Sequence, residues 1–292
     1  MDGGHLRGLA WGGNCVRLAM EGTGYIHTFE PEEQERLRTQ AEFLEPFIFP
    51  TIDFAGCREV LEVGCGVGAE MEIILRRFPD LRVTGVDFSA AQLARARLWL
   101  AEYLKTGRAR LEQGSAYQLP YADGSFDGVG IIWVLEHLRD PRRALAEAAR
   151  VLRPGGVLSG TEVFNGSWQV EPRCPAMAAY WAAFNALQRE LGGDPEVGVK
   201  LGALVEAAGF TAVEVRALPV LMDGRMRDEA ARRRFVGYWE SLWLTGAGQL
   251  LERGWVTAEL VAAVRREFAG LVGNREAVYH YAAWQVSAKR RL

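Results

Sequence analysis

A short apolar strand that leads directly into a cluster of glycines constrains this chain more than any other feature. Residues 59–63 read Glu-Val-Leu-Glu-Val, and residues 64–68 read Gly-Cys-Gly-Val-Gly. A helical pattern follows at once, with apolar side chains at i, i+3, i+4 and i+7 from Met71 to Phe78. Glycines at a strand-to-helix turn let backbone N–H groups come close to a ligand. The segment therefore predicts a ligand-binding turn in an α/β fold.

Strand and helix signals alternate through the middle of the chain, which indicates a parallel sheet covered by helices. Further strands are predicted at 82–86, 110–112, 128–134 and 157–163, with helices that begin near Ser89 and Asp140. Downstream, the pattern predicts helices at 175–191 and 200–208, strands at 211–217 and 277–286, and a long helical stretch at 226–271. We predict a doubly wound, mostly parallel, seven-stranded Rossmann-like sheet with an antiparallel C-terminal strand and helical insertions.

Composition excludes several classes of protein. The chain has 292 residues and a formal net charge of -3, and it has no basic excess of the kind that nucleic-acid binding requires. The run Arg232, Arg233 and Arg234 is expected to be a solvated helix face. Four cysteines without a C-x-x-C pair or a histidine cluster predict no metal site and indicate a reducing compartment.

Nothing in the sequence predicts a membrane segment. The first 20 residues are rich in glycine and lack the apolar core of a signal peptide. The longest strongly apolar stretch, 129–135, is far too short to cross a bilayer. We expect a cytoplasmic protein without nucleic-acid or membrane partners.

The glycine turn alone is compatible with more than one kind of ligand. Gly64, Gly66 and Ala69 also fit the G-x-G-x-x-A spacing of a dinucleotide-binding turn, which would suit an NAD(P)-dependent oxidoreductase. Asp87, which closes the second strand, can accept ribose hydroxyls in either case. Glu62 stands two residues before the first glycine, where a nicotinamide-binding strand is usually apolar.

Further motifs follow the glycine turn in a fixed order. They are Gly-Ser-Ala at 114–116, Leu-Pro-Tyr-Ala-Asp-Gly-Ser-Phe-Asp at 119–127, Leu-Glu-His-Leu at 135–138 and Leu-Arg-Pro-Gly-Gly at 152–156. With the glycine turn, they resemble the class I S-adenosylmethionine-dependent methyltransferases, particularly the branch that acts on small molecules. The resemblance covers 59–163 closely and the strands near 211 and 277 more loosely. It favours a methyltransferase of small molecules over an oxidoreductase, a nucleic-acid methyltransferase or a non-catalytic cofactor-binding protein.

The resemblance implies S-adenosylmethionine as cofactor and assigns roles to particular residues. The glycine turn would pass under the methionine part, Asp87 would hold the ribose, Phe88 would lie beside the adenine, and Ser115 would lie at the adenine edge, where relatives often carry Asp. The cofactor-binding residues that it implies are Tyr25, Glu62, Gly64, Cys65, Gly66, Asp87, Phe88, Gln92, Ser115, Ala116 and Trp133.

Several of these residues also have ordinary structural explanations. Trp133 in an apolar strand is commonly a core residue. Asp87 can simply cap the next helix, and Cys65 can simply fill space. Tyr25 and its neighbour His27 can be surface residues near the terminus.

The catalytic candidates are histidines, because imidazole can take a proton near neutral pH. His137 and His27 are the candidate bases, with Glu136 as a weaker one. His137 can equally cap or pack after the fourth strand. An acceptor that is already nucleophilic needs no base, and the choice among oxygen, nitrogen and carbon stays open.

We divide the chain into an N-terminal helical cap, 1–50, and a methyltransferase domain, 51–292. Helical insertions near 167–192 and 226–272 are expected to form a lid over the substrate. Phe235, Tyr238 and Trp239 make the second insertion rich in aromatic side chains. The flanking regions also hold seven of the nine tryptophans, at Trp11, Trp168, Trp181, Trp239, Trp243, Trp255 and Trp284. Such residues suit a hydrophobic or aromatic metabolite such as a natural-product scaffold, although packing against the sheet also explains most of them. A homodimer is possible.

Overall fold

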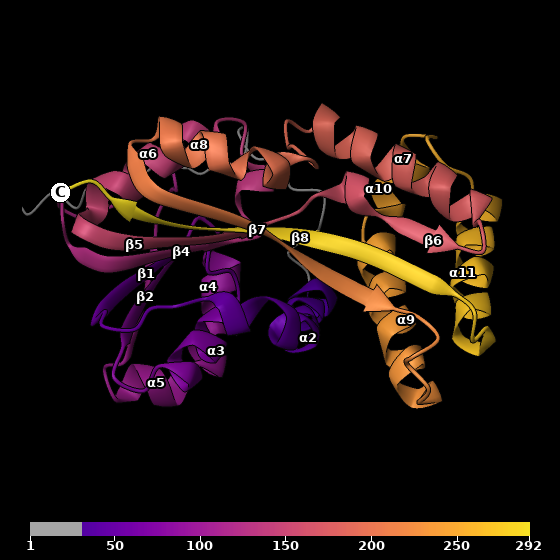
Figure 1. Cartoon of the computed structure of the whole chain (residues 1–292), viewed down its shortest axis with the longest axis horizontal. Helices are drawn as coiled ribbons and strands as arrows, with labels where there is room; N and C mark the ends of the chain where they lie inside the picture. The colour runs from indigo at the N-terminus through magenta and orange to yellow at the C-terminus, as the bar shows by residue number, and fades with distance from the viewer. Residues whose placement is uncertain (1–30) are drawn as a thin grey trace, which may run out of the picture.

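Five parallel strands form the centre of the molecule in the computed structural model, which describes residues 31–292. They pair in the order β3-β2-β1-β4-β5, and Figure 1 shows them twisting together between layers of helices. Their bounds are Glu59–Val63 for β1, Arg82–Asp87 for β2, Ala109–Gln113 for β3, Phe126–Ile132 for β4 and Leu152–Glu162 for β5. All five predicted strands are present, so the predicted doubly wound parallel sheet is confirmed.

The antiparallel part of the sheet is larger than the sequence predicts. Strand β8 (Val278–Arg290) pairs antiparallel with β5 and then with the short β6 (Gln169–Glu171) along one edge. Along its other edge it pairs with β7 (Phe210–Met222). Three residues are too few to show alternation, so β6 was not predicted, and the described sheet has eight strands rather than seven.

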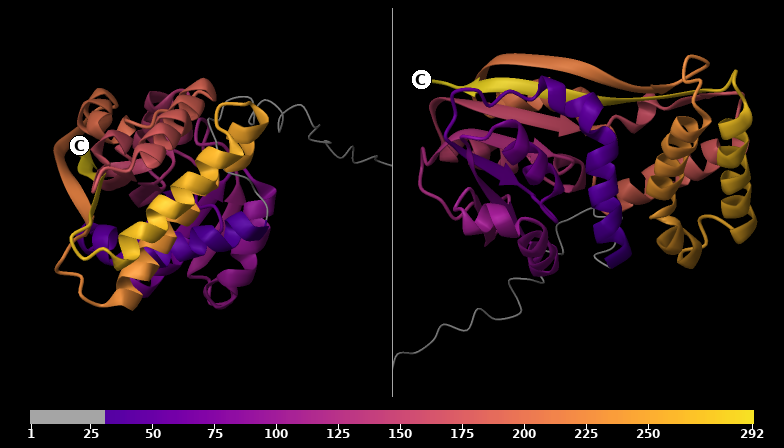
Figure 2. Two further views of the ribbon diagram at one scale, coloured as in Figure 1. Left: turned by 90° about the vertical axis from the view of Figure 1, so that its right-hand side faces the viewer. Right: turned by 90° about the horizontal axis from the view of Figure 1, so that it is seen from below.

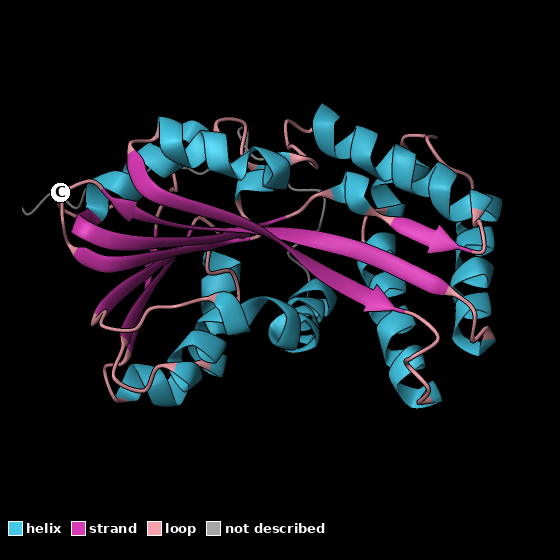
Figure 3. Ribbon diagram, viewed as in Figure 1, coloured by secondary structure: helices cyan, strands magenta, loops and turns pink. Residues whose placement is uncertain are grey.

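Helices cover both faces of the sheet (Figures 1 and 3). One face carries α6 and α8, and the opposite face carries α2 to α5. Their bounds are Pro31–Ile48 for α2, Ala69–Arg77 for α3, Ala90–Trp99 for α4, Ala101–Lys105 for α5, Pro141–Val151 for α6 and Leu201–Ala207 for α8. The helices predicted to begin near Ser89 and Asp140 do begin there, and both residues cap them: Ser89 accepts from the Gln92 N–H and Asp140 from the Arg143 N–H.

The outer ends of β7 and β8 carry a second group of helices, which we call the helical lobe. It contains α7 (Pro175–Glu190), α9 (Glu229–Leu244), α10 (Ala247–Glu252) and α11 (Ala258–Gly273), together with β6. The long helical stretch predicted at 226–271 consists of three helices, α9 to α11, and Thr257 caps the last of them by accepting from the Leu260 N–H. In the view from below, α2 lies between the core helices and the lobe (Figure 2).

Side chains from other elements complete the helix ends in the lobe. Glu267 of α11 accepts from the backbone N–H groups of Ala176 and Met177, at the start of α7. Arg232 of α9 donates to four backbone carbonyls at the end of α11 and at Asp223: Leu271, Val272, Asn274 and Asp223 itself. These contacts satisfy groups that a helix leaves without partners at its ends.

The expectation that the arginine run forms a solvated face is wrong for Arg232, which is 2% exposed. Successive helical residues point about 100° apart, so three in a row cannot share one face. Arg233 is exposed and pairs with Glu229 one turn earlier.

Among residues 31–292, no helix is both long and apolar enough to cross a membrane. The same residues contain no group of His, Cys, Asp or Glu side chains arranged to hold a metal ion. Helix α2 is the described part of the predicted N-terminal cap. Tyr25 and His27 lie outside the described residues.

Candidate functional site

One pocket runs from the carboxyl ends of β1, β2 and β4 into the helical lobe. Carboxyl ends of neighbouring parallel strands, where the strand order reverses, are the usual ligand site of such sheets. Core residues line one end, and lobe residues line the other. The predicted site residues that line it are Gly64, Cys65, Gly66, Asp87, Phe88, Gln92, Ser115, Ala116, Trp133 and His137.

The glycine turn is closed on its inner side and open toward the pocket. Gly64 has φ +72°, and a Cβ placed there would meet the Val134 side chain at 2.5 Å. Gly66 has φ +50°, yet a Cβ there would have no atom within 4 Å. A side chain at either position would be strained, and at Gly66 it would fill the open space. The turn therefore fits a ligand that packs against its backbone.

Asp87 joins this turn to the end of β2. One carboxylate oxygen accepts from the Gly66 N–H at 2.9 Å, and the other accepts from the Ser89 N–H at 2.8 Å. Burial raises the pKa of the Asp87 carboxyl, although these two backbone hydrogen bonds oppose the shift. Each oxygen keeps a free lone pair. The pair of oxygens can therefore accept the two hydroxyls of a ribose.

Gln92 and Ser115 shape the neighbouring rim. Gln92 is 3% exposed, and its side-chain oxygen has no partner among the described residues, so it can accept from a ligand. The Ser115 hydroxyl accepts from the Tyr117 N–H at 3.2 Å, which fixes the turn that contains Ala116. The Ser115 hydroxyl is neutral, so a hydrogen bond that it accepts from a ligand would lack charge assistance.

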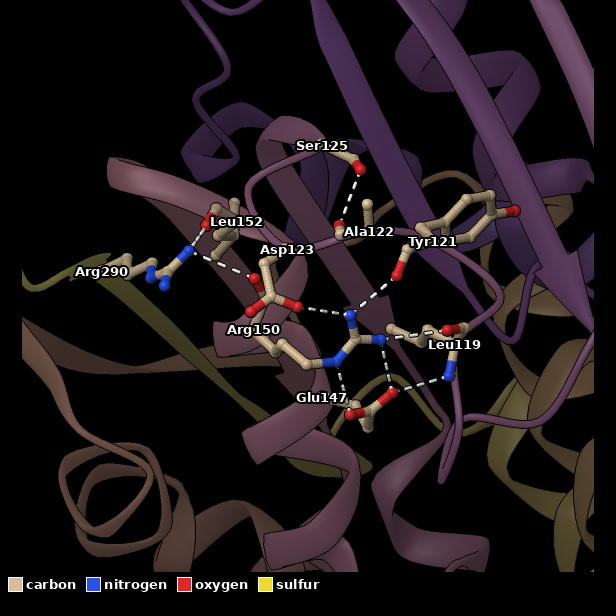
Figure 4. Close-up of polar contacts among 9 residues, drawn as sticks. All are labelled: Leu119, Tyr121, Ala122, Asp123, Ser125, Glu147, Arg150, Leu152 and Arg290. Atoms are coloured by element: carbon tan, nitrogen blue, oxygen red, sulfur yellow. Dashed lines mark hydrogen bonds and ion pairs between the residues drawn. The ribbon is translucent and has the colours of Figure 1, made fainter.

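The Leu-Pro-Tyr-Ala-Asp-Gly-Ser-Phe-Asp motif holds this rim in place (Figure 4). Arg150 of α6 donates to the carbonyls of Leu119 and Tyr121, at 3.0 and 2.7 Å, and pairs with Asp123 and Glu147. Its own carbonyl accepts from the Gly124 N–H at 3.0 Å. The motif therefore ties the loop after Ser115 and Ala116 to α6, and the contact that Asp123 makes with Arg150 is structural.

A strained turn follows β4. Trp133 has φ +57°, which is rare for a bulky side chain and marks backbone that the surrounding structure holds in place. The next three N–H groups, at 134–136, all donate to the carboxylate of Glu162. Burial and the nearby Glu136 raise the pKa of the Glu162 carboxyl. Glu162 thus fixes the 3-10 turn Leu135–His137 under the pocket.

Glu136 and His137 both face the pocket from this turn. Glu136 Oε1 lies 3.7 Å from His137 Nε2, and Glu136 Oε2 accepts from Gln188 Nε2 of α7 at 2.7 Å. Both side chains are largely buried, at 10% and 13% exposure. A carboxylate at this distance would stabilise the positive charge that forms when an imidazole takes up a proton. The lobe therefore orients Glu136, and Glu136 lies beside the predicted base.

Buried acidic side chains surround the glycine turn. Glu62 is buried and absent from the pocket lining, and its Oε2 has no partner among the described residues. Burial, with repulsion from Glu70 and Asp87, raises the pKa of Glu62. Glu70 lines the pocket, and burial raises its pKa to about 7 against the opposing charge of Arg36. The Cys65 thiol also has a raised pKa through burial and packs against Gly85, which suits a space-filling role.

Aromatic side chains form the lobe end of the pocket. Trp181 stacks on Phe184 with ring centroids 5.2 Å apart, and its indole N–H donates to the Asn165 carbonyl. The Tyr281 hydroxyl donates to the Asn165 side chain at 3.1 Å. The sequence did not identify Asn165 or Glu70 as site residues, whereas Trp181 is among the tryptophans expected to suit a hydrophobic acceptor. The aromatic content of the flanking regions, in which Trp181 and the segment 226–271 lie, was the signal available for this end.

The fold and the pocket define a class of protein: a Rossmann-like enzyme with a glycine turn and an acidic residue placed for a nucleoside. Residues 61–159 match the family model described as a methyltransferase domain. An O-methyltransferase of Aspergillus nomiae, rstn1, is 30% identical over 65% of this chain and 82% of its own length. An O-methyltransferase of Penicillium expansum, cnsE, is 31% identical over 66% of this chain and 67% of its own.

Solved structures share the fold at low sequence identity. The [4+2]-cyclase SpnF superimposes with a TM-score of 0.53 at 22% identity and covers 87% of this chain and 82% of its own. Phosphoethanolamine N-methyltransferase 2 of Haemonchus contortus, in complex with S-adenosylhomocysteine, superimposes with a TM-score of 0.54 at 17% identity. The match covers 87% of this chain and 52% of that protein. The chain belongs to the class I S-adenosylmethionine-dependent methyltransferases, and S-adenosylmethionine is its cofactor. It is of the type that methylates small molecules.

Proposed function

We propose that this enzyme methylates a hydroxyl oxygen of an uncharged, hydrophobic aromatic metabolite. The observation that carries the proposal is the single pocket that joins the glycine turn to the aromatic end of the lobe. A donor on the turn and a flat acceptor among the aromatic side chains would meet beside Trp133 and His137. The two fungal relatives carry the name O-methyltransferase, which supports oxygen as the acceptor atom.

The charges of the pocket argue against a phosphorylated or acidic acceptor. Among the described residues that line it, Arg36 is the only Lys or Arg. Its guanidinium already binds the carboxylate of Glu33 at 2.6 Å and the side chain of Gln40 at 2.6 Å. Phosphate groups are usually held by several such cations. Aromatic rings supply apolar area and stacking to an uncharged ring system instead.

We propose that the turn Gly64–Gly66 and Asp87 hold the cofactor, with Phe88, Gln92, Ser115 and Ala116 around its base. Tyr25 and Glu62 remain predicted contacts. Bound at this place, the cofactor supplies an electrophilic methyl group on a sulfonium. The protein would hold the acceptor oxygen beside Trp133 and His137, within reach of that methyl group, and the sulfonium would release the methyl group without its bonding electrons.

The protein's own task is positioning and proton removal. His137 would take the hydroxyl proton as the new bond forms, with Glu136 beside it to stabilise the imidazolium. His27 remains the second predicted base. The insertions 167–192 and 226–272 would act as the lid that excludes water, with α2, from the predicted cap 1–50, closing the remaining side.

Calorimetry and methyl transfer together test this proposal. We expect S-adenosylhomocysteine to bind and NADH not to bind. We further expect methyl-labelled S-adenosylmethionine to convert 1-naphthol to 1-methoxynaphthalene, with little transfer to 1-naphthylamine and no binding of 1-naphthyl phosphate. Binding of NADH alone would refute the cofactor assignment, and preferred transfer to the amine would refute oxygen as the acceptor.

A matched pair of histidine variants tests the base. His137→Gln should lower kcat about 100-fold or more and leave the Kd for S-adenosylhomocysteine unchanged. His280 hydrogen-bonds the Ser167 carbonyl and does not line the pocket, so His280→Gln should retain wild-type kcat. Equal activity of the two variants would show that His137 is not the base.

A further inference from the structure

Tyr238 of α9 is a residue of the helical lobe whose hydroxyl group makes no hydrogen bond within the described protein. It lines the pocket and is 5% exposed. Its ring stacks on Phe43 of α2, with centroids 3.9 Å apart and planes at 20°. Ser241 donates to the Tyr238 backbone carbonyl, but the hydroxyl makes no hydrogen bond with any other described residue. A hydroxyl on a pocket-lining side chain that makes no hydrogen bond within the described protein is available to a ligand.

The other tyrosine hydroxyls of the lobe region show the contrast. Tyr180 donates to the Trp243 carbonyl at 2.8 Å, and Tyr281 donates to Asn165 at 3.1 Å. Tyr279 is also buried without a satisfactory partner, but it does not line the pocket. Tyr238 lines the pocket, and its hydroxyl has no partner in the described protein. None of these other tyrosines has both properties.

Tyr238 lines the same pocket as charged side chains from three other elements. Arg36 of α2, Glu70 of α3 and Glu136 of the turn after β4 all act on its hydroxyl electrostatically. Burial, supported by the two carboxylates, raises its pKa, and Arg36 opposes the shift. The hydroxyl therefore keeps its proton and serves as a hydrogen-bond donor rather than a base.

We propose that the Tyr238 hydroxyl donates a hydrogen bond to an oxygen atom of the methyl acceptor. The inference rests on the proposed function and adds a specificity-determining residue to the same site. The Phe43 stack holds the ring, so the hydroxyl is positioned before the acceptor arrives. Apolar rings select a flat hydrophobic molecule, and Tyr238 selects among such molecules those that carry oxygen.

The substitution Tyr238→Phe tests the inference, because it removes one oxygen atom and keeps the stacked ring. Protein saturated with S-adenosylhomocysteine is titrated with 1-naphthol and with naphthalene, and 1-naphthol is also assayed for methyl transfer. We expect Tyr238→Phe to weaken 1-naphthol binding and to lower kcat/KM about tenfold. Naphthalene binding and the Kd for S-adenosylhomocysteine should stay unchanged. Tyr279→Phe, which removes a buried hydroxyl outside the pocket, should match wild type in all four measurements.

The outcomes separate the inference from the proposed function. If wild type methylates 1-naphthol and Tyr238→Phe does so equally well, the inference is overturned and the proposed function stands. If Tyr238→Phe weakens naphthol and naphthalene alike, the residue acts through packing, which also overturns it. If wild type binds S-adenosylhomocysteine but neither binds nor methylates 1-naphthol, the proposed acceptor class fails, and the inference fails with it.

Discussion

Arg232 gives the sharpest test of how the helical lobe is held together. Its guanidinium is buried and donates to the carbonyls of Leu271 and Val272, in the last turn of α11, and to those of Asn274 and Asp223. Arg232→Met keeps much of the apolar stem but leaves four carbonyls without a donor. Each unpaired carbonyl costs about 1–3 kcal/mol where water cannot reach it. The substitution also removes the free-energy cost of burying the guanidinium charge, which offsets part of this loss. We expect a net loss of about 3–5 kcal/mol.

The neighbouring arginine supplies a matched control. Arg233 is exposed and forms only a surface ion pair with Glu229, so Arg233→Met should cost less than about 0.5 kcal/mol. Urea denaturation is followed by tryptophan fluorescence, because the lobe contains Trp181, Trp239 and Trp243. If Arg232→Met destabilises the protein no more than Arg233→Met does, water must satisfy these carbonyls, and the proposed role of Arg232 in joining α9 to α11 is wrong.

Three shorter predictions concern the cofactor end. Burial raises the pKa of Glu70 from 4.5 to about 7, so the folded state keeps a proton that the unfolded state loses as the pH rises between these values. Stability should fall over that range, and Glu70→Gln should raise the melting temperature at pH 8 but not at pH 4, with a gain in stability of at most about 3 kcal/mol. Gly64→Ala should lower stability by about 2 kcal/mol or more, because its Cβ meets Val134. Gly107 has a similar positive φ, but a Cβ there would meet no atom within 4 Å. Gly107→Ala in the same denaturation series therefore measures the cost of the strained backbone without the clash. Asp87→Asn should weaken S-adenosylhomocysteine about 10- to 100-fold by calorimetry, and an unchanged Kd would remove Asp87 from the ribose site.

The core of the fold and the cofactor end of the pocket could be predicted because their signals are local. A strand, a glycine turn and a helix are adjacent in the chain, so residues 59–78 specify their own geometry. Asp87 ends the next strand, and parallel pairing brings it to the glycine turn without further information. The structure places the Asp87 carboxylate on the Gly66 N–H at 2.9 Å, as this reasoning requires.

The acceptor end could not be predicted in the same way, because its contacts join distant segments. Asn165 meets Tyr281 across more than 100 residues, and Gln188 meets Glu136 across 52. Phe43 stacks on Tyr238 from a helix almost 200 residues earlier. Composition indicated only that 226–271 is aromatic. Which rings would pack together and which would face the pocket depends on where β7 and β8 carry the lobe.

This difference bears on specificity in the enzyme. The cofactor end is built on β1, β2 and the turns between strands and helices, where a change of residue strains the backbone. The acceptor end is built from side chains on helices that extend from β7 and β8. A ring there can be exchanged at the cost of local packing, without moving the glycine turn or Asp87. A Tyr238 substitution should therefore alter which acceptor is used while cofactor affinity holds, whereas a Gly64 substitution should lower both together.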